Sequence, residues 1–216
     1  NMGGAVELKQ INYFTISNNQ MVTDEYLSDK DVVFLVYAAV PNVTTLNRII
    51  NGLEASPKRV RIISYDSSGT NPEAFKLDYF KEDISSIRYS SHSSYENSLV
   101  HTPGTEYFWK DGPFTKGELI ESATYRNSDG TFGEATLAAT SKVLPIFELD
   151  GAMVFGVNKE KRIVYIGDSQ YGQSQTGDTY QGKKFNNNRG EVNNNIEKIF
   201  SNIWAWVIDE VVLKDE

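Results

Sequence analysis

The sequence predicts an α/β fold, a three-layer sandwich with a mostly parallel central sheet, helices on both of its faces and an antiparallel hairpin at one edge. Three observations lead to this prediction. Val32–Val40 is continuously apolar and rich in β-branched residues, as are strands that are buried on both faces. A strand–helix–strand pattern begins with this run and extends over about thirty residues. An amphipathic helix closes the chain.

The first part of the chain supplies parallel strands and the helices between them. Residues 1–30 hold an edge strand or an N-terminal extension, and Val32–Val40 ends at Pro41. Apolar residues then recur at helical spacing over 46–53, and the strand Arg59–Tyr65 follows. Pro72 suits the first turn of a second helix. We expect a further short strand over Ile84–Tyr89.

The second part is less regular until its end. Apolar residues show no regular spacing between Ser90 and Gly112, which predicts a long loop. Asp129-Gly130 indicates a hairpin turn between residues 123–125 and 131–132. A clearer hairpin joins Ala152–Val157 to Arg162–Gly167, and a polar excursion separates it from an amphipathic helix over Ile196–Val211. Without a repeat or a linker, we predict a single domain over residues 1–216.

Composition excludes several classes of function. The 216 residues carry a formal charge of −8, which works against non-specific attraction to nucleic acid or anionic lipid. The chain has no cysteine, which rules out disulfides, thiolate zinc sites and cysteine nucleophiles. It has no signal peptide at Asn1 and no apolar run of about 18 residues, so we expect no membrane insertion.

The residues that follow the strand Arg162–Gly167 are the first candidates for a site. Ligands of open α/β sheets sit at the carboxyl ends of strands, so Asp168 and Ser169 are candidate ligand-binding residues. A Gly-Asp-Ser block also occurs in esterases, with the serine as nucleophile. Such a serine needs a histidine base, and both histidines of this chain precede the block. The simpler interpretation is that Asp168 and Ser169 bond to the backbone of a turn.

The remaining candidates are a metal site and an aromatic surface. Asp168 and Asp178 are weak candidates for holding a cation, whereas His92 and His101 lack a recognised ligand spacing and suit solvated loop positions. We therefore predict no cofactor. Tyr107 and Trp109 could stack on a sugar ring if they are exposed, and they fill the core if they are buried.

A family resemblance rests on the carboxyl-terminal third. Its matching features are the hairpin over 151–169, the run Asn193-Asn194-Asn195 and the closing segment 202–206, with the early strand 33–36 in support. Over residues 143–208 the chain resembles glutamine-amidotransferase-like domains of class I, in a branch found in bacterial secreted and surface proteins. Catalytic members of that class use a cysteine with a histidine and a glutamate near the carboxyl end. The resemblance therefore implies the flavodoxin-like scaffold without the reaction.

These observations favour a protein that is not an enzyme. We expect a non-catalytic structural or interaction module of a larger bacterial surface or secreted protein, located outside the cell or at its surface. Its partners would be other domains of the parent polypeptide or another protein. A carbohydrate- or small-ligand-binding domain, with glycan as the partner, is the first alternative. A hydrolase that uses Ser169 or a cation bound by Asp168 is the second.

Overall fold

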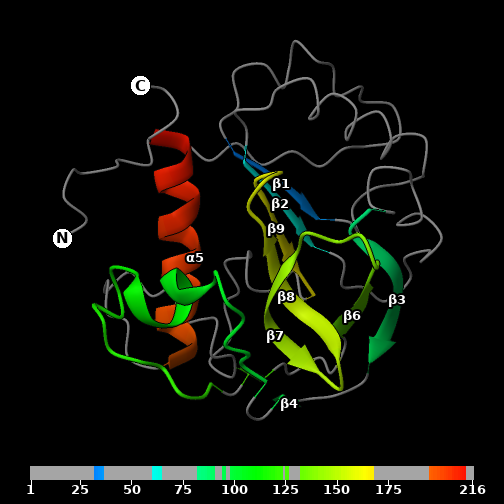
Figure 1. Ribbon diagram of the computed structural model, residues 1–216, viewed down its shortest axis with the longest axis horizontal. Coiled ribbons are helices and arrows are strands. Elements are labelled where there is room, and N and C mark those ends of the chain that lie inside the picture. Colours follow the sequence, from blue (N-terminus) through cyan, green and yellow to red (C-terminus); the bar gives the residue numbers. More distant parts are fainter. Residues whose placement is uncertain are drawn as a thin grey trace.

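The computed structural model describes eight stretches of the chain, which Figure 1 shows as ribbon or coloured trace. They are residues 32–36, 60–64, 82–90, 94–95, 98–123, 125–126, 132–167 and 195–212. The expected helices over 46–53 and from Pro72, the strand before residue 31 and the polar excursion after Gly167 lie outside these stretches.

The main structure is a mixed seven-stranded sheet. Its strands are β1 (Val32–Val36), β2 (Val60–Ser64), β3 (Ile84–Ser90), β6 (Phe132–Leu137), β7 (Leu144–Leu149), β8 (Ala152–Asn158) and β9 (Ile163–Ile166). They follow the order β1-β2-β9-β8-β6-β3, and β7 also pairs with β8. A second, two-stranded sheet pairs β4 (Ser94–Tyr95) with β5 (Tyr125–Arg126).

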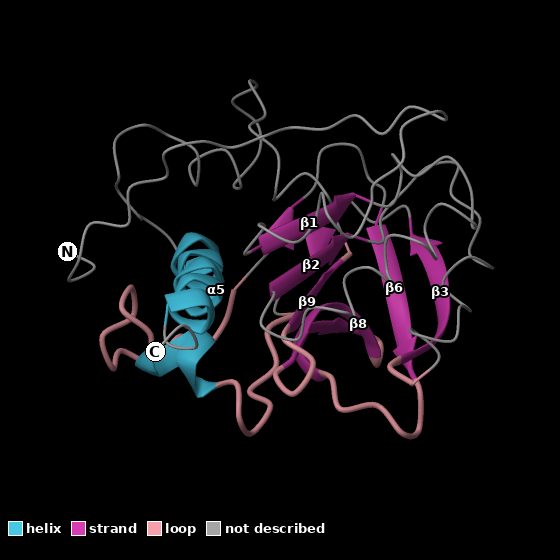
Figure 2. Ribbon diagram, turned by 90° about the horizontal axis from the view of Figure 1, so that it is seen from above, coloured by secondary structure: helices cyan, strands magenta, loops and turns pink. Residues whose placement is uncertain are grey.

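The prediction of a mostly parallel three-layer sandwich is wrong. β1, β2 and β9 do pair in parallel, but the other four pairings of the main sheet are antiparallel. Within the described residues there is one α-helix, α5 (Asn195–Val212), and it lies to one side of the sheet (Figures 1 and 2). A continuous apolar run indicates a central strand that is buried on both faces. It does not indicate whether the neighbouring strands are parallel or antiparallel, which is why the prediction failed.

The hairpin of β8 and β9 is confirmed, but it lies inside the sheet and not at its edge. All seven residues of β8 and all four of β9 are buried. β7 pairs along β8 from Leu144 opposite Val157 to Leu149 opposite Ala152. The sequence pattern does not predict β7. Pro145 removes a backbone donor, and two register shifts interrupt the alternation of side chains along the strand.

One edge of β8 pairs with β7, and its other edge pairs with both β9 and β6. β9 pairs with Phe155–Asn158 and β6 pairs with Met153, while β7 occupies the other edge. Gly167 lies where the pairing of β8 changes from β9 to β6. Its N–H donates to the carbonyl of Val154 at 2.6 Å, and its carbonyl accepts from the N–H of Gly133 at 2.8 Å. A Cβ atom on Gly167 would lie 2.3 Å from the Gly133 oxygen and 2.8 Å from the Val154 oxygen. Only glycine fits this junction.

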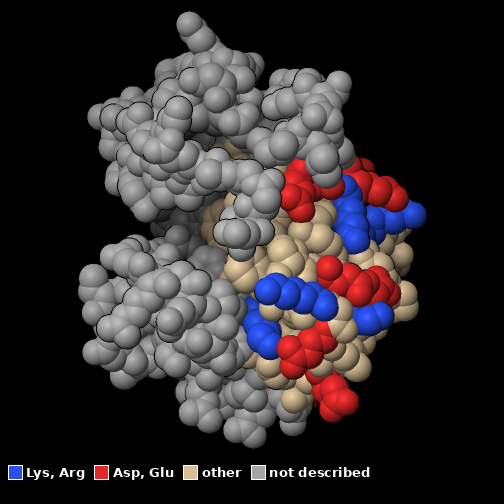
Figure 3. All heavy atoms as spheres, turned by 90° about the vertical axis from the view of Figure 1, so that its left-hand side faces the viewer, with Lys and Arg blue, Asp and Glu red and all other residues tan. Residues whose placement is uncertain are grey.

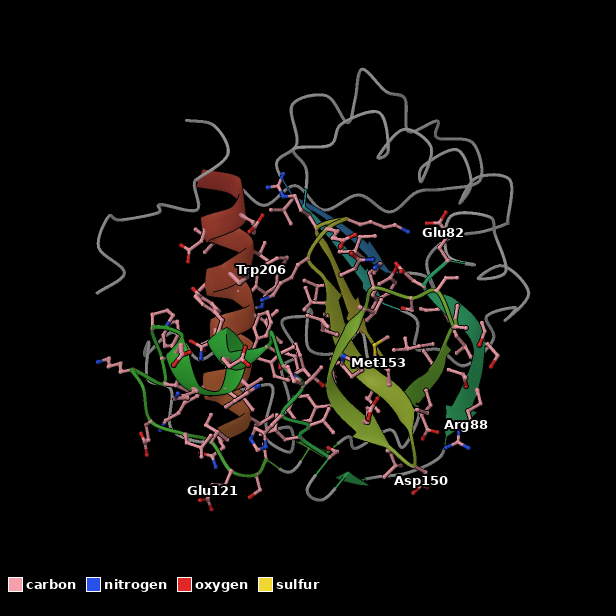
Figure 4. All side chains as sticks on the ribbon, in the orientation of Figure 1. Glu82, Arg88, Glu121, Asp150, Met153 and Trp206 are labelled. Atoms are coloured by element: carbon pink, nitrogen blue, oxygen red, sulfur yellow. The ribbon has the colours of Figure 1, made fainter. Side chains whose placement is uncertain are left out.

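α5 covers one face of the sheet. Val164 and Ile166 of β9 belong to the same apolar cluster as Ile199 and Phe200 of α5, and Trp206 lies on the side of the helix that faces the sheet (Figure 4). The predicted helix over Ile196–Val211 is thus confirmed. Its apolar spacing of three and four residues arises because this stripe is what covers the strands.

The carboxyl end of α5 is tied to the turn between β8 and β9. Arg162 is buried and has a positive φ of 56°. Its guanidinium donates to the carbonyl oxygen of Glu210 and forms an ion pair with the Glu210 carboxylate at 3.2 Å. A cation at this point also complements the negative end of the helix dipole.

One local prediction for the middle of the chain needs correction. The expected long loop from Ser90 to Gly112 contains β4 and a five-residue π-helix, η3 (Tyr107–Asp111). The expected turn at Asp129-Gly130 lies outside the described stretches; on either side of it, Tyr125 pairs with Tyr95 and Phe132 pairs with Ser90. The predicted strand over Ile84–Tyr89 is confirmed as β3.

Replacing Gly167 tests the junction. We expect Gly167→Ala to lower the free energy of unfolding by about 2–3 kcal/mol, because the new methyl group meets backbone oxygens that are fixed by strand pairing. Gly151→Ala is the control. Gly151 has φ +75° but no atom near its Cβ position, so its replacement should cost only about 1 kcal/mol. Urea denaturation measures both values, and equal losses would contradict the role of Gly167.

Candidate functional site

The backbone brings three parallel strand ends to one edge of the sheet. Val36 of β1 pairs with Ser64 of β2, and Ser64 pairs in turn with Ile166 of β9, so the three carboxyl ends are level. We call this edge, formed by Val36, Ser64 and Ile166, the carboxyl rim. Parallel strands place the residues that follow them on one side of a sheet, where ligands commonly bind.

The predicted ligand-binding residues Asp168 and Ser169 follow this rim in the sequence. Gly167 is the last described residue before them, and both lie outside the described stretches, as does Asp178. Ligand binding by Asp168 and Ser169, and the weak cation site at Asp168 and Asp178, therefore stay predictions. What the structure adds is their point of departure, because the bonds of Gly167 fix where the chain leaves the sheet.

Trp109 of η3 is a core residue. Its side chain is 8% exposed, and its indole N–H donates to the hydroxyl of Thr105 at 2.9 Å. The His101 ring lies edge-on to the indole, with 4.5 Å between ring centroids. Nε2 of His101 is 2.8 Å from the carbonyl oxygen of Ile120, to which it donates. Trp109 thus presents no open face on which a sugar could stack.

Tyr107 of η3 is half-buried and joins η3 to α5. Its hydroxyl donates to Oδ2 of Asp209 at 2.7 Å. Burial, followed by this bond to a carboxylate, raises the pKa of the Tyr107 hydroxyl above its ordinary value. The hydroxyl therefore stays a donor, and it holds Asp209 in place. Tyr107 and Trp109 are neighbours in one short helix, but they serve different contacts.

Asn202 of α5 is the residue that holds η3 and the following turn. It is fully buried, and its amide group donates to the Phe108 carbonyl at 3.0 Å and to the Thr115 hydroxyl at 3.1 Å. Its Oδ1 accepts from the N–H of Phe114 at 2.9 Å. Gly112 permits this approach, since a Cβ there would lie 2.4 Å from Cγ of Asn202. The sequence signal for this contact is an asparagine within the apolar stripe of the helix.

Replacing Asn202 by alanine should be costly. Two buried groups and one part-buried group each lose a hydrogen bond, so we expect Asn202→Ala to lower the free energy of unfolding by about 3 kcal/mol. Asn195→Ala in the same helix is the control, because Asn195 is exposed and its side-chain amide donates to the Ser122 carbonyl at 2.9 Å. It should cost less than about 1 kcal/mol. Similar losses in thermal or urea unfolding would disprove the central role of Asn202.

A second buried polar cluster joins β3 to the hairpin of β8 and β9. Asp83, 1% exposed, accepts from the Tyr165 hydroxyl at 2.7 Å. The amide of Asn158 is 3.0 and 3.1 Å from its two carboxylate oxygens. Nζ of Lys161 lies 3.8 Å from Asp83 and 2.6 Å from Glu82, which Figure 4 labels beside β3. Asn158 pairs with Ile163 at the start of β9, whereas Tyr165 directly precedes Ile166 of the carboxyl rim.

The hydroxyl of Tyr165 should contribute more to stability than the hydroxyl of Tyr107, because it is more deeply buried. The hydroxyls of Tyr165 and Tyr107 both donate to an aspartate at 2.7 Å, but Tyr165 is fully buried and Tyr107 is not. We expect Tyr165→Phe to cost about 2 kcal/mol of unfolding free energy and Tyr107→Phe less than about 1 kcal/mol, because water replaces only the second bond. Urea unfolding of both variants tests this. A larger loss for Tyr107→Phe would overturn the comparison.

Positive and negative side chains are mixed on the described part of the face drawn in Figure 3. Figure 3 shows basic and acidic side chains intermingled rather than gathered by sign. Among the described residues Lys198 pairs with Glu118 at 3.1 Å, and Lys110 lies 3.8 Å from Asp111. Among the described residues there is no group of three or more acidic, histidine or cysteine side chains that could hold a metal ion. No described helix is both long and apolar enough to cross a membrane.

Comparisons with known proteins give no relative for this chain. No protein-family model matches it, and neither curated proteins nor solved structures show a significant match.

Proposed function

We propose that this chain is a non-catalytic interaction module of a larger bacterial surface or secreted protein, and that its partner binds at the carboxyl rim. The observation that carries the proposal is the level register of Val36, Ser64 and Ile166. It brings the ends of three parallel strands together at a single edge. The segments that leave such an edge are free to vary without disturbing the sheet, which suits recognition.

The buried polar groups support a binding role rather than a chemical one. Asp83 is bonded to Tyr165 and Asn158, Asn202 to three groups around η3, and Trp109 to Thr105. The bonds of Asp83 and Asn202 each join segments that are far apart in the sequence, whereas the Trp109 bond stabilises the start of η3. The groups thus orient η3, α5 and the hairpin toward one another, and a stable frame of this kind is what an interaction surface requires.

The geometry of η3 favours a macromolecular partner over a glycan at that helix. Trp109 is buried, and the hydroxyl of Tyr107 is bonded to Asp209. A sugar-binding surface needs an open aromatic face with free polar neighbours. The glycan alternative therefore rests on Asp168 and Ser169, which follow β9 in the sequence.

A cysteine scan can test whether a partner covers the rim. The chain has no cysteine, so a single introduced thiol is its only maleimide target. We would compare Ser169→Cys with Ser86→Cys, an exposed position on β3, in the isolated chain and in the protein within its native cells. We expect the thiol at 169 to react at least about tenfold more slowly in cells, as for a partner at roughly ten times its dissociation constant. The thiol at 86 should react equally in both settings. Equal rates at both positions would refute a covered rim.

Substrate and sugar screens separate the alternatives. We expect the wild type, Ser169→Ala and Asp168→Ala to show the same background rate on ester and phosphoester substrates. Turnover by the wild type that is lost in either variant would establish a hydrolase instead. A rise in melting temperature with one member of a sugar panel, abolished by Asp168→Ala, would establish a glycan-binding domain.

A further inference from the structure

We draw no further inference here: the strongest candidate, the pair of carboxylates of Asp66 and Asp168 that follow the ends of the parallel strands β2 and β9, is an acidic pair beyond the described residues, and nothing within those residues points to a ligand there.

Discussion

The shared edge of β8 is the constraint on which the described fold depends. β7 occupies one edge of this strand, so β9 and β6 must divide the other. The two backbone bonds of Gly167 make that division, because they join the end of β9 to both Val154 and Gly133. The parallel strands β1, β2 and β9 therefore extend from one half of β8, and the antiparallel pair β6 and β3 extends from the other. The same junction sets where the chain leaves the sheet toward Asp168.

Polar anchors decide how the remaining elements sit on this sheet. Apolar burial supplies most of the driving force for packing α5, but it has little directional preference. Asn202 fixes η3 against the helix, Arg162 fixes the end of the helix against the hairpin, and Asp83 fixes β3 against β9. Each anchor bonds to groups far away in the sequence, and an unpaired partner would be penalised by burial. Together they select one arrangement among the many that apolar contact would allow.

Local sequence patterns predicted several strands and the helix correctly, but they did not predict which strands pair with one another. Periodicity identified β3, the hairpin of β8 and β9, and α5, since each pattern records which side chains are buried. It could not show that β7 and β6 flank the hairpin, because strand order is decided by long-range pairing. The anchors were missed for the same reason: Asp83 and Tyr165 are 82 residues apart, and Asn202 and Phe108 are 94 apart. The ligand-binding residues Asp168 and Ser169 and the resemblance to glutamine-amidotransferase-like domains stay predictions.

The position of α5 near the end of the chain has a consequence for biosynthesis. Residues 195–212 leave the ribosome after every strand of the main sheet. Until then Val164, Ile166 and Phe155 lack the contacts that α5 makes with them, although their strands can already pair. A nascent chain at that stage exposes an apolar sheet face of the kind that aggregates or recruits chaperones. Synthesis of α5 is therefore the step that shields this face of the sheet from water.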